Sequence, residues 1–336
     1  MKAIVQEAYG SPDVLQLRDI DKPVAEDDEV LVRVRAASVH PDVWHVLTGL
    51  PYVLRVMGAG LRKPKNPVPG TDLAGVVESV GKDVTRFRPG DEVFGETLKG
   101  MQWINGGAYA EYATAPEVAL ALKPANVTFE QAAAVPTSAL IALPNLRTGG
   151  EIQPGHKVLV NGAGGGVGVI AVQLAKAFGA DVTGVDCASK LDMLLSIGAD
   201  QVIDYTQEDY TRRDERYDLI FDITGNHSFS ACRRALRPTG TYVLIGHDNY
   251  GKAMRRWVGA IPYMFKLVAM SLFVSQLKNM GGPKSSKQES MALLRELLES
   301  GKLTPHIDRT YPLSEVPEAI RYLQGGSAKG KIVITV

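Results

Sequence analysis

Cysteine is scarce in this chain of 336 residues, which has only Cys187 and Cys232. Two cysteines cannot build a disulfide framework, and no C-x-x-C spacing is present for structural zinc. An excess of charge is also missing, since 37 Lys and Arg balance 37 Asp and Glu. The chain therefore has no net positive charge that would attract nucleic acid or an anionic membrane. We expect a protein of a reducing, cytoplasmic setting that has no nucleic-acid partner.

Long hydrophobic runs are scarce as well. The N-terminal MKAIVQEAYG is already strand-like and has no apolar core of an export signal. The most apolar run, Trp257 to Val274, contains Pro262 and Lys266 and barely reaches the length of a membrane span. We expect a buried or interfacial segment there and no integral membrane helix.

Glycine, in contrast, is concentrated in the most informative stretch, residues 156–186, HKVLVNGAGGGVGVIAVQLAKAFGADVTGVD. This pattern predicts an apolar strand, a glycine-rich turn, an amphipathic helix and a second strand that ends in Asp186. Ala163, Gly165 and Gly168 fill the three positions of the dinucleotide fingerprint G-x-G-x-x-G, with alanine at the first. Bare backbone can approach a pyrophosphate there, and the helix N-terminus faces its charge. We predict a dinucleotide site made by Gly162, Ala163, Gly165, Gly166, Val167 and Gly168.

Before this stretch the chain shows short strands punctuated by turns, which predict an all-β barrel or sandwich. Val30, Val32 and Val34 should face one side of a strand, with Arg33 and Arg35 on the other. A proline-rich, basic insert at residues 50–69 interrupts the strands. It is either a solvated loop or a lid over a pocket.

Strands and helices alternate from residue 157 to residue 245, which predicts a parallel sheet with helices on both faces. Thr128 is a plausible N-cap for the helix that leads into this region. An amphipathic helix is expected at Glu289 to Ser300, and a last strand at Lys331 to Thr335 should return to the first region. The expected class is therefore α/β. Its barrel-like domain spans residues 1–125 and is completed by 290–336, and its nucleotide-binding domain spans 126–289.

Motifs along nearly the whole chain resemble the medium-chain dehydrogenase/reductase superfamily, in its zinc-free branch of quinone oxidoreductases and enone reductases. They are GTDLAGVVESVG at 70–81, FRPGDEVFG at 87–95, GAYAEYA at 107–113, AAAVPTSALIAL at 132–143, NGAGGGVG at 161–168, GADQVIDY at 198–205 and GKIVITV at 330–336. The resemblance implies a GroES-like β-barrel joined to a Rossmann domain, with the active-site cleft between them. It also implies hydride transfer from NAD(P)H to a quinone or an α,β-unsaturated carbonyl.

The chain departs from the zinc-dependent members of that superfamily. Where those hold the metal, this sequence has His40, Thr71 with Asp72, and no cysteine in the third segment. Such a set is too small for the three protein ligands of catalytic zinc, so we expect no metal site. Donors for the carbonyl oxygen would be His40, which can also be a turn cap, and Tyr52 of the insert, which can also simply line the pocket.

The resemblance also distributes cofactor contacts. Asp186 can accept the ribose hydroxyls of NAD and repel a 2′-phosphate, whereas Ser189 and Lys190 can hold that phosphate if Asp186 turns away. We expect NAD(H) over NADP(H), and we expect Lys190 to be a solvated residue of its helix. Thr137 should approach the nicotinamide and Tyr205 the adenosine phosphate. The remaining implied contacts are Thr224, Gly225, Ile245 and Gly246 near the ribose and carboxamide, and Lys331 near the phosphates unless it is a surface lysine of the barrel.

Two other functions remain open at this point. One is a zinc-free ketone or alcohol dehydrogenase, which a substrate panel separates from an enone reductase. The other is a nucleotide-binding protein that associates with membranes or RNA through Trp257 to Val274 and the adjacent Arg255 and Arg256. The same run can instead cover the cleft or bury a subunit contact, and we prefer these two roles. The resemblance implies a homodimer that acts on a small-molecule substrate.

Overall fold

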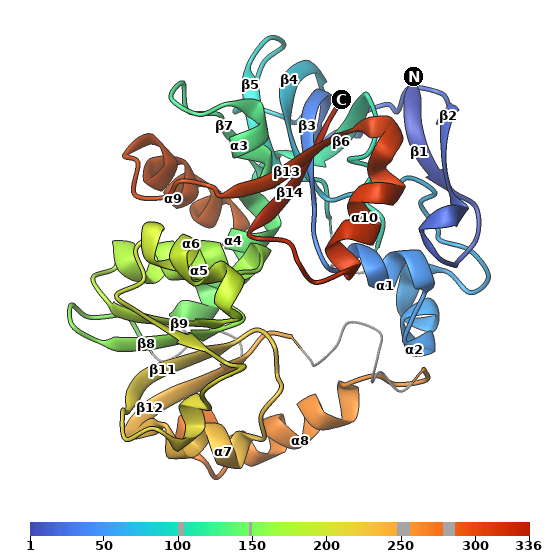
Figure 1. Ribbon diagram of the computed structural model, residues 1–336. Coiled ribbons are helices and arrows are strands. Elements are labelled where there is room, and N and C mark those ends of the chain that lie inside the picture. Colours follow the sequence, from blue (N-terminus) through green and yellow to red (C-terminus); the bar gives the residue numbers. More distant parts are fainter. Residues whose placement is uncertain (100–103, 148–149, 247–255, 278–285) are drawn as a thin grey trace.

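The structure is a computed structural model that describes residues 1–336 except 100–103, 148–149, 247–255 and 278–285. Three sheets with surrounding helices make up two joined domains, and the two larger sheets lie in different domains (Figure 1). The first domain contains β1 (Lys2–Gln6), β2 (Leu15–Asp19), β3 (Glu29–Val39), β4 (Asp72–Val80), β5 (Glu92–Glu96), β6 (Tyr112–Pro116), β7 (Leu120–Leu122), β13 (Ile307–Pro312) and β14 (Lys331–Thr335).

The larger sheet of this domain has the order β13-β14-β3-β4-β5-β7, and β6 pairs with β3. Its alternation is as expected in β3, because Val30, Val32 and Val34 are buried in one core while Arg33 and Arg35 are exposed. The chain end returns as expected too, since β14 pairs antiparallel with β3. The expected strands did not include β2, which pairs with β1, or β13, which pairs with β14.

The second sheet is parallel throughout, in the order β10-β9-β8-β11-β12. Its strands are β8 (Lys157–Asn161), β9 (Asp181–Asp186), β10 (Gln201–Asp204), β11 (Tyr217–Asp222) and β12 (Leu236–Leu244). Neighbours along β8 point to opposite faces, because Val158 and Val160 join one core and Leu159 joins another. Burial on both faces explains why this strand is continuously apolar. The predicted doubly wound Rossmann sheet is confirmed.

Ten α-helices are assigned in the described residues: α1 (Val43–Thr48), α2 (Tyr52–Leu54), α3 (Phe129–Ala133), α4 (Pro136–Leu146), α5 (Gly166–Ala177), α6 (Ala188–Ser196), α7 (Phe229–Arg234), α8 (Ile261–Ser271), α9 (Lys287–Glu299) and α10 (Val316–Gln324). Thr128 caps α3 as expected, in a capping box with Gln131. A second capping box, Ser286 with Glu289, starts α9 slightly before its expected first residue.

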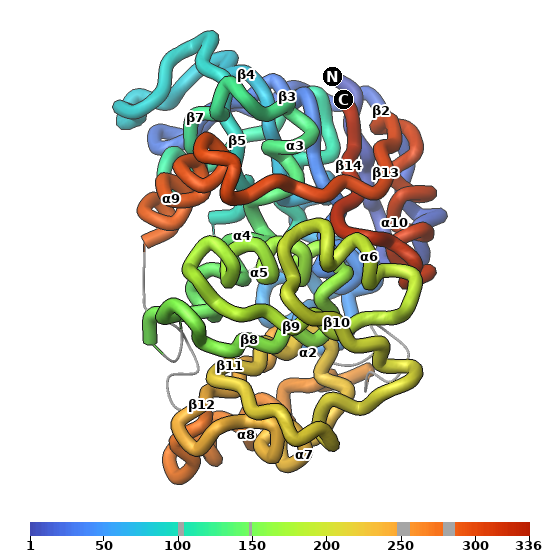
Figure 2. The backbone as a smooth tube through the Cα atoms, turned by 60° about the vertical axis from the view of Figure 1, so that its left-hand side comes forward, coloured from blue at the N-terminus to red at the C-terminus, as the bar shows by residue number. Residues whose placement is uncertain are grey.

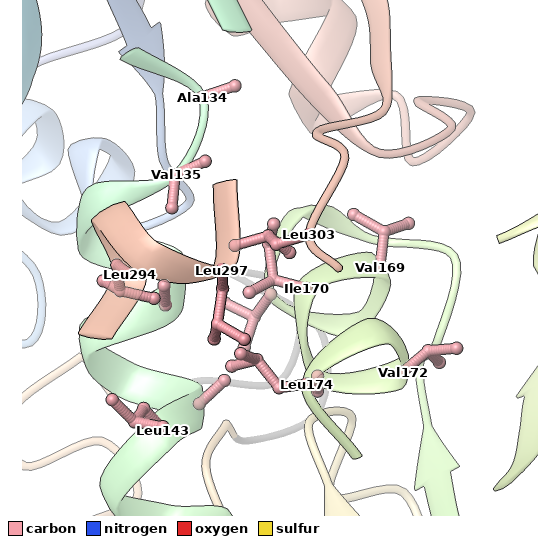
Figure 3. Close-up of a cluster of buried hydrophobic side chains, with 14 of the residues drawn as sticks. Ala134, Val135, Leu143, Val169, Ile170, Val172, Leu174, Leu294, Leu297 and Leu303 are labelled. Atoms are coloured by element: carbon pink, nitrogen blue, oxygen red, sulfur yellow. The ribbon is translucent and has the colours of Figure 1, made fainter. Parts of the chain in front are cut away.

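A shared core joins the two domains. Leu294 and Leu297 of α9 lie among Leu143 of α4 and Ile170 and Leu174 of α5 (Figure 3). The same core also includes alanines of the first sheet. The helices between the two sheets therefore share one hydrophobic core with the first domain. The expected domain boundary at residue 290 falls inside α9. Figure 2 shows β13 and β14 running between the barrel above and α5 and α6 below.

The apolar run at residues 257–274 differs from what we expected. It forms α8, which buries Leu267 but leaves Phe265 68% exposed, and Phe273 just beyond the helix is 88% exposed. Of the two expected alternatives, a buried segment is wrong for much of this run, and an interfacial segment stays a prediction. No helix in the described residues is long and apolar enough to cross a membrane.

Candidate active site

The glycine-rich turn joins β8 to α5 and has the geometry that the fingerprint predicts. Gly162 has φ 86°, a conformation that residues with a side chain rarely adopt. A Cβ added to Gly168 would lie 2.3 Å from the Gly162 carbonyl oxygen, so only glycine lets α5 pack this closely on the turn. α5 begins at Gly166, and the first N–H groups of a helix have no partner within it. The turn is therefore a fitting cradle for a pyrophosphate.

Asp186 ends β9 beside this turn. Its carboxylate accepts the Gly164 N–H at 2.8 Å and the Cys187 N–H at 2.9 Å. Lys190 is not the solvated residue that we expected, because it is 7% exposed and its Nζ lies 3.7 Å from Asp186 Oδ1. The Lys190 ammonium also donates to the Gly326 carbonyl at 3.4 Å. A carboxylate and an ammonium thus stand together where the adenosine ribose is expected.

The other expected cofactor residues lie at the same edge, because all five parallel strands end there. Tyr205 follows β10, is 55% exposed, and donates its N–H to the Asp186 carbonyl at 3.1 Å. Burial and nearby acidic groups raise the pKa of its phenol. The other expected residues at this edge are Ser189 in α6, Thr224 and Gly225 after β11, and Ile245 and Gly246 after β12.

Asp222, the last residue of β11, organises this edge and was not among the expected residues. Its carboxylate accepts hydrogen bonds from Asn161 Nδ2, the Gly225 N–H and the Tyr242 hydroxyl, each at 2.8 Å. Burial raises the pKa of the Tyr242 phenol. Three strands and the Gly225 turn are thereby fixed through one buried carboxylate.

Lys331, in β14, is 1% exposed and is not the surface lysine that was the alternative. A Cβ added to Gly166 would lie 3.1 Å from Lys331 Cδ, so the lysine passes directly beside the start of α5. Its ammonium donates to Ser138 Oγ at 3.2 Å and to Asp72 Oδ2 at 3.4 Å. Desolvation lowers the pKa of Lys331, and the Asp72 carboxylate opposes that shift. The neighbouring Gly330 N–H donates to the Gly164 carbonyl at 2.9 Å, which ties β14 to the glycine-rich turn.

Thr137 lies at the domain boundary and is bound to Asp72. Its backbone N–H and its hydroxyl donate to Asp72 Oδ1 at 2.8 and 2.5 Å. The Thr137 hydroxyl is also 3.2 Å from Thr71 Oγ1 and 3.3 Å from Glu96 Oε2. Burial raises the pKa of Glu96, and contact with the Lys287 ammonium opposes that shift. The Thr137 side chain, in the first turn of α4, is therefore held against the barrel.

His40 faces a small cavity at the end of β3. The imidazole is 5% exposed, and its Nε2 has no partner among the described residues. Its Nδ1 lies 3.1 Å from Asp42 Oδ2 and 3.3 Å from the Asp42 N–H. When Nδ1 accepts the Asp42 N–H, the neutral ring carries its proton on Nε2 and donates from that atom into the cavity. In the other neutral tautomer Nδ1 donates to Asp42 Oδ2 and Nε2 accepts.

Two further polar groups border this cavity, which has room for about one water molecule. Thr71 connects it to Thr137, and the buried Asn105 leaves Oδ1 without a partner among the described residues. The expected site residues did not include Asn105, because nothing in the local sequence marks it. The cavity therefore pairs a donor, His40, with an acceptor, Asn105.

Tyr52 is not among the residues that border the His40 cavity. Its ring packs edge-on against Trp257 with centroids 5.3 Å apart, and the Arg55 guanidinium lies 4.8 Å from its centre. The insert is thus partly helical and is held against the apolar run. The structure brings His40, Thr137, Lys331 and the glycine-rich turn to one boundary, and it leaves Tyr52 at the edge of this site.

The residues at the zinc position of related enzymes do not fit a metal. Asp72 is fully buried and its oxygens already serve Ser38, Thr137 and the Lys331 ammonium. A cation next to the carboxylate would repel a second one. Within the described part of the chain, no group of three or more His, Cys, Asp or Glu is placed to hold a metal ion.

Known families match most of the chain. The family described as Alcohol dehydrogenase GroES-like domain matches residues 26–125, and the one described as Zinc-binding dehydrogenase matches residues 197–334. A 2-methylene-furan-3-one reductase of Solanum lycopersicum is 34% identical, over 99% of this chain and 79% of its own. An NADPH-dependent alkenal/one oxidoreductase, chloroplastic, of Arabidopsis thaliana is 33% identical over the same shares.

A solved structure agrees with these relatives. The quinone oxidoreductase from Coxiella burnetii has a TM-score of 0.83 and 29% identity, covering 100% of this chain and 99% of that one. The chain belongs to the medium-chain dehydrogenase/reductase superfamily, in its quinone oxidoreductase-like branch.

Proposed function

We propose that the protein is an NAD(P)H-dependent oxidoreductase that reduces a quinone or an α,β-unsaturated carbonyl without zinc. One observation supports this most strongly: the buried His40 directs an unpaired Nε2 into a cavity that Thr71 links to Thr137. The resemblance implies that Thr137 approaches the nicotinamide. A relative that is an alkenal/one oxidoreductase and a solved structure that is a quinone oxidoreductase agree with this substrate class.

The residues of this chain divide the work between binding and protonation. The glycine-rich turn and the start of α5 bind the pyrophosphate, and Asp186 accepts the ribose hydroxyls. The bound reduced nicotinamide supplies a hydride to the substrate. Negative charge then develops on the substrate carbonyl oxygen, where His40 Nε2–H donates a hydrogen bond or a proton. Hydride and proton together complete the two-electron reduction. Tyr52 stays a second candidate donor that has to move away from Trp257 to act.

The coenzyme is proposed to be NAD(H) in preference to NADP(H). The Asp186 carboxylate disfavours a 2′-phosphate, and the Lys190 ammonium at 3.7 Å offsets only part of that repulsion. The occupied oxygens of Asp72 support the proposed zinc independence. A cytoplasmic location fits two free cysteines. A homodimer rests on the resemblance alone.

A substrate panel tests this proposal on the purified protein. Oxidation of NADH and of NADPH is followed with a quinone, an enone and a saturated ketone, before and after treatment with a chelator. We expect turnover of the quinone or the enone, unchanged by chelation. Turnover confined to the saturated ketone and the corresponding alcohol would instead indicate a ketone or alcohol dehydrogenase. Loss of activity on chelation, restored by zinc, would refute zinc independence.

A further inference from the structure

Two long stretches of this neutral chain contain no acidic residue. Residues 43–71 include four Lys and Arg and no Asp or Glu, and residues 249–288 include seven and none. Together they hold eleven of the 37 basic residues and none of the 37 acidic ones. The zero net charge therefore hides a marked local excess of positive charge, and the remainder of the chain is correspondingly acidic.

The fold brings the described residues at 52–53 of the first stretch and at 256–257 of the second together. The Tyr52 N–H donates to the Arg256 carbonyl at 2.7 Å, and the Val53 N–H donates to the Trp257 carbonyl at 3.1 Å. The Tyr52 and Trp257 rings make the edge-on contact described above. Figure 1 shows α2 next to the segment that leads into α8. The insert and the apolar run are thus neighbours, although about two hundred residues separate them in the sequence.

The joined region exposes large apolar side chains. On α8, Leu267 is buried and Tyr263 and Met270 pack against the Rossmann core, so these residues form the inner face. The opposite face presents Phe265 and Val268, and Leu272 follows at the same helical spacing, 77% exposed. The other large apolar residues exposed in this region include Val56 at 75%, Leu61 at 70%, Trp257 at 73% and Phe273 at 88%. So many exposed apolar residues in one region mark an interaction surface.

Cations surround these apolar groups. The exposed ones are Arg62, Lys63, Lys65, Arg256 and Lys266. None of the five forms an ion pair within the described ranges of the chain. Most of the other described lysines and arginines do form one, for example Lys2, Lys99, Lys176 and Arg237. We call the exposed side chains of residues 56–65 and 256–273 the basic apolar face.

We propose that the basic apolar face binds the surface of an anionic phospholipid bilayer. Its apolar side chains can enter the region between headgroups and acyl chains while its cations meet lipid phosphates and carboxylates. A second copy of this chain fits less well. A two-fold contact through this face would place two positively charged surfaces that lack acidic residues against each other, and they would repel. Nucleic acid also fits less well, because contacts with a phosphate backbone would leave the aliphatic side chains in water.

Vesicle sedimentation with the full chain tests this proposal, which does not depend on the proposed activity. Vesicles of phosphatidylcholine alone are compared with vesicles that also contain phosphatidylserine, at low and high salt. We expect binding to the anionic vesicles that weakens as salt rises, and little binding to the neutral ones. Equal binding to both, or binding to neither, overturns the proposal.

Matched variants separate the apolar and the charged contributions. Phe265→Ser with Leu272→Ser should reduce partitioning into anionic vesicles at least tenfold, an order of magnitude that follows from about 1.5 kcal/mol or more per buried side chain. Lys63→Glu should reduce it by roughly fivefold or more, because it removes one basic residue near the surface and adds an acidic one. The controls are Val24→Ser, at a residue 86% exposed in the barrel, and Lys302→Glu, at an exposed residue after α9.

Binding of coenzyme by each variant verifies that it is folded. If the controls weaken vesicle binding as much as the variants of the basic apolar face, the binding does not use this face and the proposal fails. It also fails if duplex DNA binds with the same dependence on Lys63 and Phe265. A concentration-dependent dimer that the Phe265→Ser, Leu272→Ser variant abolishes, without vesicle binding, would assign the face to a second copy instead.

Discussion

Lys331 and Asp72 form a buried ion pair between the last strand and the fourth, with Nζ 3.4 Å from Oδ2 and the two side chains 1% and 0% exposed. The pair spans β3, which lies between β14 and β4 in the sheet, and Lys331 borders the start of α5. Through Thr137 and Ser138, Asp72 and Lys331 also fix the first turn of α4. A single electrostatic contact therefore joins three parts of the candidate site.

Replacement of Lys331 by methionine should destabilise the protein. The Asp72 carboxylate would lose its buried cationic partner, and removal of one partner of a buried pair typically costs about 3–5 kcal/mol of unfolding free energy. Denaturant unfolding measures this cost. Adding Asp72→Asn should restore part of the loss, because the orphaned charge is then gone. Lys302→Met, at an exposed site, is the control; an equally small effect at both lysines would contradict a stabilising ion pair.

Two glycines of the turn should respond differently to alanine. A Cβ at Gly168 would meet the Gly162 carbonyl at 2.3 Å, so Gly168→Ala should lower the melting temperature. A Cβ at Gly165 would find only the Gly162 oxygen, at 3.7 Å, so Gly165→Ala should fold normally. It should nevertheless bind coenzyme at least tenfold more weakly, since its methyl group stands where the pyrophosphate approaches. Thermal unfolding and fluorescence titration distinguish the two effects, and full coenzyme affinity in Gly165→Ala would argue against the cradle.

Asp186→Ala should shift coenzyme preference towards NADPH by about tenfold or more. The variant removes the carboxylate that repels a 2′-phosphate and leaves the Lys190 ammonium to attract it. The measurement is the ratio of dissociation constants for NADH and NADPH from intrinsic fluorescence. Asp181→Ala, at the exposed start of the same strand, is the matched control. An unchanged ratio in Asp186→Ala would remove this carboxylate from the ribose site.

His40→Leu should lower kcat by about a hundredfold, the smaller end of the effect expected for a lost proton donor. Coenzyme affinity should stay the same, because His40 belongs to the substrate side of the boundary. His40→Gln keeps a side-chain donor and should retain more activity. His156→Gln, at a histidine just before β8 and at the opposite end of that strand from the glycine-rich turn, provides the control. Normal kcat in His40→Leu would transfer the role to Tyr52 or to water.

Glu96 should make stability depend on pH. Burial raises the pKa of this carboxyl in the folded protein, so the folded state holds the proton more tightly than the unfolded state. Its contribution to stability is then greatest below the unfolded pKa of about 4.3 and falls as pH rises through the higher folded value. Glu96→Gln should flatten this part of the pH profile of the melting temperature. Glu151→Gln, at an exposed residue, should leave the profile as it is; a wild-type profile in Glu96→Gln would contradict the shift.

The sequence predicted the elements whose pattern is local. The glycine-rich turn requires particular backbone conformations, and most strands show their burial in their spacing, so the turn and most strands were predicted, whereas β2 and β13 were not. The two lysines were harder to predict, because the environment of a single cation depends on segments far away in the chain. Lys190 is buried by Gly326 and Lys331 by Asp72, and no spacing encodes either contact.

The apolar run shows a second limit of sequence patterns. A buried helix and an exposed apolar helix have the same composition, and only the tertiary structure distinguishes them. Phe265 and Leu272 lie on the outer face of this segment because Leu267 and Met270 already fill the inner one. Asn105 was missed for a related reason, since its role depends on lying beside His40, which is remote in sequence.

The position of β14 has a consequence for biosynthesis. This strand lies between β13 and β3, and its first residues brace the glycine-rich turn. A ribosome translates the turn long before it reaches residue 331, so the sheet of the emerging barrel lacks β14 during most of elongation. The sheet can therefore complete its pairing, and the turn can gain the Gly330 hydrogen bond, only after this late segment has left the exit tunnel.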